Sequence, residues 1–380
     1  MPHTKHRYLF IDLLRFLAVV FMVQGHTFDA LLDFDLRSAT LFYAHDFFHG
    51  FIAPMFLFAS GVAFGISTLK KWEEHTVLSM KVWRRFGKFA GLLLIGYALH
   101  LPYFSLSKLL TQGTPGDWAV WLQVDALHCI AATMFLLQGL VLVVRTERRF
   151  IAVTAGTAVL IIFASPLVWS SGFTDGMPLW LASYVNASNN SWFPLFPWAA
   201  YILTGVTFAW FFLEAKEHHH AVQLMQRAVS VGTVLLLLAA ILANIPFHLY
   251  PPHDFWKVNP LMILARIGFV LLVTSAVFFA EHSFHLTSPL PSILGRESLF
   301  IYILHLIILY GSVVNNGLQQ IVLPTLSVGW SFVSFVSLFL VLTAITVLWS
   351  RLKRWSPLAA MTARASLAVI FLLNFLTRPY

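Results

Sequence analysis

The chain has 380 residues, of which 59% are hydrophobic and only 11% carry a charge. A soluble domain needs about 25% charged residues to cover its water-facing surface, so the composition excludes an ordinary soluble protein. The net charge of +8 would suit a nucleic-acid-binding protein, but the placement of the basic residues along the chain explains it better. The single cysteine, Cys129, excludes an intramolecular disulfide and a cysteine metal cluster.

Apolar runs recur from one end of the chain to the other. Each has roughly the 17–25 residues that a helix needs to cross about 30 Å of hydrocarbon, and only a helix satisfies its own backbone groups there. We therefore predict an all-α polytopic membrane protein of about eleven transmembrane helices, forming a single domain over residues 1–380. The predicted spans are 8–30, 47–68, 84–104, 126–145, 149–171, 194–214, 228–246, 262–282, 298–318, 327–350 and 359–376.

Basic residues concentrate in alternate loops between these spans. Eighteen of the 24 Lys and Arg residues fall in one set of loops and four in the other. This asymmetry predicts a cytoplasmic N-terminus and an outside C-terminus. The first apolar run contains Asp12 and Arg15 and lacks a small-residue cleavage site, so we expect it to be retained as a helix. His218, His219 and His220 are expected to lie in a solvated cytoplasmic loop.

Charged side chains inside the predicted first helix point to function. Each costs at least ~2.5–3.5 kcal/mol near the centre of the bilayer. Asp12, Arg15, Met22 and His26 share one helical face, and Asp12 and Arg15 can pair at i and i+3. At ~1.5 Å per residue, Arg15 and His26 are about 16 Å apart along the axis. A structural ion pair with an interfacial histidine is the alternative interpretation.

A second polar group opens the second span. His45 and His49 lie at i and i+4, on one helical face, with Asp46 between them. The spacing suits a metal pair, but no convincing third ligand is near in the sequence. A histidine that accepts a proton near neutral pH is the better interpretation for His45. For His49 we favour an interfacial histidine bonded to the backbone.

Further polar residues fall near the ends of later spans. Asp125, His128, Trp198 and Arg266 all fall at the outer level and predict a polar pocket that opens outward. At the cytoplasmic end of the ninth span, three side chains form a stripe that, with Asp12 and Arg15, predicts a second polar entrance. These three are Ser298, Tyr302 and His305.

Several of these segments carry a family resemblance. They are Ile11 to Arg15, His45 to Gly50 with Pro54 to Gly61, Val124 to Ala131, Phe196 to Trp198, and Leu294 to His305. In this order, over about residues 8–310, they resemble the bacterial branch of the heparan-α-glucosaminide N-acetyltransferase family, within a wider set of transmembrane acyltransferases. The chain beyond about residue 310, including the spans at 327–376, matches only as hydrophobic helices.

The resemblance implies acetyl transfer from cytoplasmic acetyl-CoA to a sugar on the other side of the membrane. The family's active histidine, by motif position, is His45. Acyltransferases of the related type three carry an arginine and a histidine ten residues apart in the first helix, a separation that Arg15 and His26 have. The sequence departs from its relatives at His128, commonly glutamine, and at Phe16, often glycine.

We therefore predict a histidine-dependent membrane acyltransferase with acyl-CoA as co-substrate and no metal. His45 or His26 would remove the acceptor's proton or carry the acyl group, and Asp46 or Asp125 would orient the imidazole. Acyl-CoA would be held by Asp12, Arg15, Arg84, Arg85, Ser298, Tyr302 and His305, and the acceptor by His49, His128, Trp198 and Arg266.

The expected partners are the lipid bilayer, acyl-CoA and a sugar, glycan or glycolipid acceptor, with no nucleic acid. The expected location is the bacterial cytoplasmic (inner) membrane, and a homo-oligomer is compatible with the sequence. The competing function is a membrane transporter or flippase for a polar or glycolipid substrate. Few intramembrane acids and no evident inverted repeat argue against it.

Overall fold

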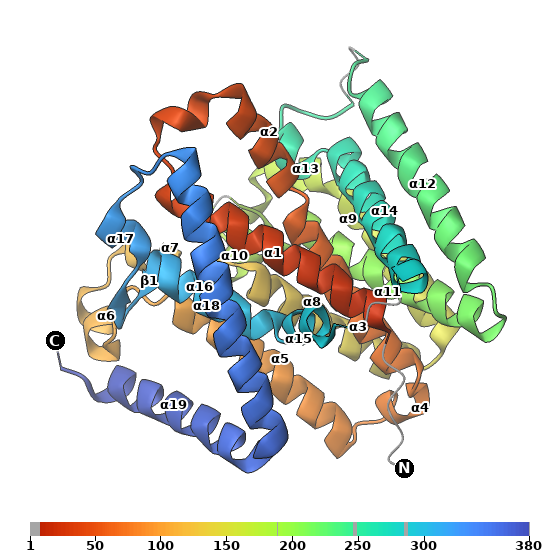
Figure 1. Cartoon of the computed structure of the whole chain (residues 1–380). Coiled ribbons are helices and arrows are strands. Elements are labelled where there is room, and N and C mark those ends of the chain that lie inside the picture. Colours follow the sequence, from red (N-terminus) through yellow and green to blue (C-terminus); the bar gives the residue numbers. More distant parts are fainter. Residues whose placement is uncertain (1–7, 188, 246–248, 285–287, 380) are drawn as a thin grey trace. The chain divides into compact units, whose positions relative to one another are not determined.

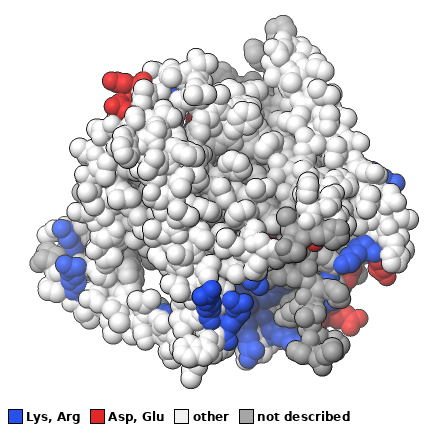
Figure 2. Space-filling model, viewed as in Figure 1, with Lys and Arg blue, Asp and Glu red and all other residues white. Residues whose placement is uncertain are grey.

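The computed structural model describes residues 8–187, 189–245, 249–284 and 288–379, and 81% of the chain is helical. Within these ranges nine helical segments are long and apolar enough to cross a membrane, or ten if one bent pair counts as a single span. The prediction of an all-α polytopic membrane protein is confirmed. The face in Figure 2 carries few charged side chains, as a surface in contact with lipid requires.

By their internal contacts the helices form two compact units. Unit 1 comprises residues 1–52, 99–121 and 285–380, and unit 2 comprises 53–98 and 122–284. Unit 1 contains α1 (Leu9–Leu31), α2 (Thr40–His49), α6 (Leu106–Gln112), α7 (Pro115–Trp121), α15 (Pro289–Arg296), α16 (Ser298–Tyr310), α17 (Leu318–Val322), α18 (Val328–Trp355), α19 (Pro357–Thr377), and the short strands β1 (Gly311–Ser312) and β2 (Asn315–Asn316).

Unit 2 holds most of α3 (Ile52–Leu69), with α4 (Trp72–His75), α5 (Met80–Leu99), α8 (Ala126–Val144), α9 (Glu147–Ser170), α10 (Leu179–Val185), α11 (Leu195–Glu217), α12 (Ala221–Leu242), α13 (Phe255–Val258) and α14 (Pro260–Phe284). Helices α12 and α14 lie side by side, and α9 packs against α11 (Figure 1). In unit 1, α1 packs against α15, α16 and α18.

Two predicted spans differ from the helices found. The span expected at 84–104 is α5, a helix of 20 residues that does not qualify by composition, because its first half carries Lys81, Arg84, Arg85 and Lys88. The span expected at 298–318 ends at Tyr310. Gly311 adopts a positive φ of 83° and begins a two-stranded hairpin, so the helix stops there.

Helix α16 is too short to cross a membrane alone. Its 13 residues extend about 20 Å, less than the hydrocarbon thickness of about 30 Å. It joins α15 at an angle of 71°, and the two together qualify as a broken span or a re-entrant segment. At the junction, Glu297 forms an ion pair with Lys353 of α18.

Helices α3 and α11 approach each other so closely that glycine is needed on both. A Cβ at Gly61 would overlap the Ile202 carbonyl, and one at Gly205 would overlap the Phe58 carbonyl. Gly61 and Gly65 are four residues apart, the small-residue spacing that lets membrane helices touch backbone to backbone. The backbone contact at this crossing constrains how α3 and α11 pack in unit 2.

His75 ends α4, outside the candidate membrane spans, and is only 7% exposed. Gln138 donates a hydrogen bond to its backbone carbonyl at 3.0 Å. Burial, and next the charge of Arg85, lower the pKa of His75 from 6.5 to about 4. The folded protein therefore holds this imidazole neutral where an unfolded chain would protonate it.

We expect this histidine to make the protein less stable in mild acid. Below pH 6.5 the unfolded chain binds a proton at His75 that the folded chain refuses until about pH 4, so stability falls as the pH drops through this window. The melting temperature in detergent should fall less between pH 7 and pH 5 in His75→Gln than in the wild type. Equal falls in the two proteins would show that His75 does not contribute.

Candidate catalytic histidine cluster

Four histidines gather inside unit 1 although they come from three helices. His26 lies on α1, His45 and His49 on α2, and His305 on α16. The ring centroids of His45 and His49 are 6.1 Å apart, those of His49 and His26 5.8 Å, and those of His26 and His305 5.2 Å. We call these four residues the histidine cluster.

Gln24 orients the ring of His45. The Nε2 atom of His45 lies 3.1 Å from the Gln24 side-chain oxygen and 2.8 Å from its nitrogen. The rings of Phe28 and Phe42 flank the imidazole at 5.4 and 5.6 Å. In the described structure the Nδ1 atom of His45 is buried without a hydrogen-bond partner. One ring nitrogen is therefore held by an amide and the other is available.

The sequence predicted Asp46 or Asp125 in the orienting role and missed Gln24. The Asp46 side chain is exposed, and Gln24 on α1 is the residue bonded to the His45 ring. The available signal was an amide within an apolar run, two residues before His26. It could not be interpreted because the contact joins residues 21 positions apart in the chain.

His49 occupies the space between His45 and α1. Its ring is nearly parallel to that of His45, at 13°, and edge-on to that of His26, at 86°. A Cβ at Gly25 would overlap the His49 ring, so only glycine at position 25 admits the imidazole. The sequence favoured an interfacial His49 bonded to the backbone. The structure instead places its ring between those of His45 and His26.

We expect Gly25→Ala to disturb catalysis through His49. The added methyl group would push the His49 ring out of its place and release the stacked His45. Displacing a catalytic group by about 1 Å can cost a hundredfold in rate, so kcat should fall by about that factor. Gly139→Ala on α8, where an added Cβ meets nothing within 4 Å, is the matched control. Equal kcat values for the two variants would show that His49 tolerates displacement.

The structure brings together His26 and His305, for which the sequence predicted separate roles, in catalysis and in acyl-CoA binding. Helix α16 packs along α1 and ends beside His26, where the Tyr310 hydroxyl lies 3.1 Å from His26 Nδ1. His305 is fully buried, its Nδ1 bonds to the Ile301 carbonyl at 3.0 Å, and its Nε2 has no partner within the described ranges. Because His305 contacts His26, it belongs to the histidine cluster.

Of the other residues of the predicted cytoplasmic entrance, Tyr302 lies beside His305, with ring centroids 5.6 Å apart, whereas Asp12 lies where α1 meets α15. Asp12 is 2% exposed and accepts a hydrogen bond from Ser292 of α15 at 3.1 Å. Gly295 packs directly against the Asp12 backbone carbonyl. Asp12 therefore joins α1 to α15, a structural role that explains its burial. Arg15, Ser298 and Tyr302 are half-buried.

In unit 2, Asp125 and His128 form a pair at the start of α8. Asp125 caps the helix, and its Oδ1 lies 2.7 Å from His128 Nδ1, while the two residues are 2% and 0% exposed. The Tyr97 ring packs edge-on against the His128 ring at 4.2 Å. Asp125 thus orients the imidazole of His128.

The two predicted phosphate-binding arginines of α5 differ in their surroundings. Arg84 is exposed. Arg85 donates a hydrogen bond to Thr68 at 2.9 Å and lies 4.5 Å above the Phe64 ring, so it connects α5 to α3. Only Arg84 of the two faces outward.

Trp198 and Arg266 lie together in unit 2. The Arg266 guanidinium carbon lies 5.8 Å from the centre of the Trp198 ring. Both side chains are buried.

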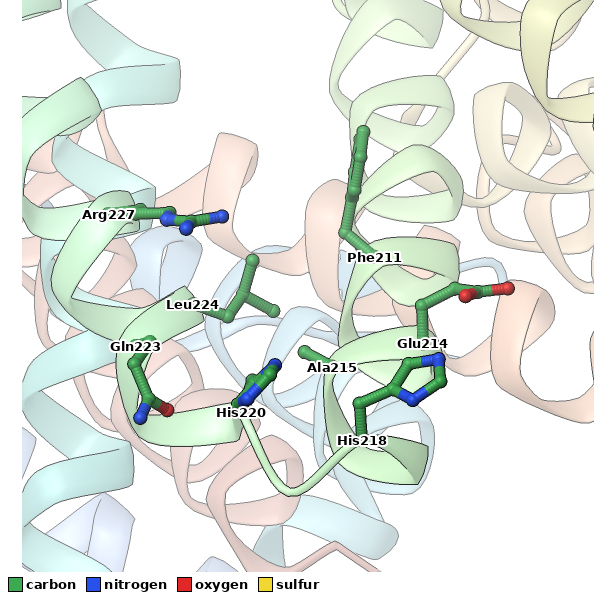
Figure 3. A pocket seen from close by; sticks show the side chains of 8 residues that line it. All are labelled: Phe211, Glu214, Ala215, His218, His220, Gln223, Leu224 and Arg227. Atoms are coloured by element: carbon green, nitrogen blue, oxygen red, sulfur yellow. The ribbon is translucent and has the colours of Figure 1, made fainter.

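A separate surface cavity of about 320 Å3 opens where α11 meets α12 (Figure 3). His218 and His220 belong to the loop between these helices, which the sequence predicted to be solvated, and both are exposed. None of the predicted site residues lies in this cavity. Its lining is Phe211, Glu214, Ala215, His218, His220, Gln223, Leu224 and Arg227.

Comparison with known proteins identifies the family. Residues 7–243 match the family model described as heparan-alpha-glucosaminide N-acetyltransferase, catalytic. No individual curated protein matches the chain. The matched segment covers more than half of the chain and runs from α1 through α12, and it includes His26, His45 and His49. The chain therefore belongs to the heparan-α-glucosaminide N-acetyltransferase family and is a membrane acetyltransferase.

Proposed function

We propose that this protein moves an acetyl group from cytoplasmic acetyl-CoA to a hydroxyl or amino group of a sugar on the opposite side of the membrane, with His45 as the catalytic base. The observation that carries the proposal is the His45 imidazole, held by Gln24 within the histidine cluster, on a segment that matches an acetyltransferase catalytic domain. A cytoplasmic N-terminus fits the distribution of Lys and Arg, and we propose the bacterial cytoplasmic membrane as the location.

The chemistry needs one proton acceptor and one leaving group. His45 takes the proton of the acceptor hydroxyl or amine while the oxygen or nitrogen attacks the thioester carbonyl carbon. The carbon–sulfur bond then breaks, and the thiolate of CoA leaves and receives the proton. In the alternative route His45 attacks the thioester first, and the acyl group passes from its ring to the acceptor. In both routes a ring nitrogen of His45 must be free of other hydrogen bonds, and among the described residues the buried Nδ1 has no hydrogen-bond partner.

Acetyl-CoA brings phosphate groups that need cations. The basic first half of α5 supplies exposed Lys81, Arg84 and Lys88, which attract phosphates from solution. Arg15 of α1 is the cation proposed to meet the donor inside unit 1, with Ser298 and Tyr302 on α16. The acetyl group itself supplies the electrophilic carbonyl.

Release of free thiol from acetyl-CoA tests the proposal. Purified protein in detergent would be given acetyl-CoA with a panel of amino sugars and simple glycosides, and thiol would be measured together with labelled acetyl on the sugar. We expect both to appear in equal amounts. A transporter would consume no acetyl-CoA, so absence of thiol release with every acceptor and absence of acetyl-CoA binding would contradict the proposal.

A further inference from the structure

Arg266 is a buried cation with unused hydrogen-bond donors. It lies on α14 and is 7% exposed, and its Nε and Nη1 atoms have no hydrogen-bond partner among the described residues. No Asp or Glu of the described structure pairs with it. A charged side chain at such a position costs several kcal/mol unless something compensates it, so a buried group of this kind needs an explanation.

Two polar side chains of α11 lie beside Arg266. Trp198, on α11, is 9% exposed, and its Nε1 atom also has no partner within the described ranges. Tyr201 follows three residues later on the same helical face, its ring 5.8 Å from that of Trp198, and its hydroxyl is buried beside the guanidinium. An indole N–H and a guanidinium can only donate hydrogen bonds.

Packing fixes these donors in place before any ligand arrives. Phe193 holds the Trp198 ring at a centroid distance of 4.6 Å. Arg266 lies in the second turn of α14, which is anchored along its length by α12. Donors that are held in position lose little entropy when a ligand binds. A ligand that uses these donors must offer hydrogen-bond acceptors, and a negative charge on it would compensate the buried guanidinium.

We propose that Arg266 and Trp198 form a binding site for an oxyanion, namely a carboxylate, phosphate or sulfate group. The guanidinium donates Nε–H and Nη1–H to two oxygens of one anion, the fork geometry that arginine forms with such groups. The indole N–H supplies a third donor. The site belongs to unit 2 alone and does not depend on the proposed acetyl transfer.

Thermal unfolding with defined anions tests this site in the full-length protein. The wild type in detergent would be titrated with inorganic phosphate against chloride at equal ionic strength, with glucuronate against glucose, and with phosphatidylglycerol against phosphatidylcholine. We expect a saturable rise in melting temperature with at least one oxyanion and none with its neutral counterpart. Stabilisation by phosphate or glucuronate indicates a water-borne anion, and stabilisation by phosphatidylglycerol alone indicates a lipid headgroup.

Variants separate the site from general charge effects. Arg266→Gln should abolish the rise in melting temperature, whereas Arg149→Gln, which removes an exposed arginine of α9, should keep it. Trp198→Phe keeps the ring and removes only the N–H, so it should weaken the affinity by about tenfold or more. Because it retains Arg266, this variant remains informative if Arg266→Gln does not fold.

The opposite results would overturn the proposal. They are the absence of saturable stabilisation by every oxyanion, or equal stabilisation in the wild type, Arg266→Gln and Trp198→Phe. Thiol release from acetyl-CoA is measured separately. Absence of anion binding at Arg266 would therefore leave the proposed acetyl transfer standing, and absence of acetyl transfer would leave the proposed anion site standing.

Discussion

Replacing His45 with glutamine is expected to lower kcat for acetyl transfer by two to four orders of magnitude, roughly the contribution of a general base. Glutamine can still meet Gln24, but it cannot accept the acceptor's proton or carry an acetyl group. Because the side-chain volume is nearly kept, the variant should fold, and its KM for acetyl-CoA should change little. Thiol release at saturating acetyl-CoA, followed in purified variants, measures the effect.

A histidine outside the histidine cluster, His282, provides the control. The Nδ1 atom of His282 on α14 bonds to the Phe278 carbonyl at 2.9 Å, the same type of intrahelical contact that His305 makes. His282→Gln should keep wild-type kcat. His26→Gln separates the two family patterns: if His26 is the base, its variant loses activity and His45→Gln keeps it. Wild-type turnover in His45→Gln would contradict the assignment of His45.

Replacing Gly61 with alanine is expected to destabilise the protein by about 1–3 kcal/mol, the usual cost of overpacking. The new Cβ would overlap the Ile202 backbone carbonyl, and a backbone atom cannot rotate away as a side chain can. Helices α3 and α11 would have to separate, and their packing against each other would be lost. The melting temperature of the detergent-purified variant measures the loss.

Glycines elsewhere provide the matched control for this substitution. Gly156 of α9 meets nothing within 4 Å when a Cβ is added, so Gly156→Ala should be neutral or slightly stabilising, because alanine favours a helix more than glycine does. Gly205→Ala, on the other side of the same crossing, should resemble Gly61→Ala. If Gly61→Ala and Gly156→Ala have the same melting temperature, the close approach of α3 and α11 does not limit stability.

Much of the fold could be predicted from local pattern. An apolar run of membrane length must be a helix, so α1, α8, α9, α11, α14, α18 and α19 fall within about five residues of their predicted ranges, whereas α12 begins seven residues before its predicted start. The end of α16 could not be predicted this way, because Ile307, Leu309 and Tyr310 continue the apolar pattern up to the glycine that turns the chain. The apolar composition predicts that a helix forms here, but the backbone conformation of Gly311 determines that α16 ends at Tyr310.

The candidate site was harder to predict than the fold. Spacing identifies neighbours only within one helix, so His45 and His49 could be paired from the sequence. Contacts between helices carry no such signal. Gln24 with His45, and His26 with His305, become neighbours only through the packing of α1 against α2 and α16.

Two buried acids make structural contacts that the sequence did not predict. Asp12 and Asp125 were predicted to act in catalysis or donor binding because charges inside a membrane usually mark function. The structure gives both a local structural role. Asp12 accepts a hydrogen bond from Ser292 where α15 meets α1, and Asp125 caps α8 and holds His128. Their proposed roles in the reaction stay predictions.

Transfer across a bilayer is the central claim, and a sided assay tests it most directly. Proteoliposomes would enclose an acceptor sugar, and acetyl-labelled acetyl-CoA, which does not cross lipid, would be added outside. The account predicts labelled sugar within the lumen and an equal amount of free CoA thiol outside, both lost in His45→Gln. Labelled sugar that forms only when donor and acceptor share one compartment, or none at all, would contradict it.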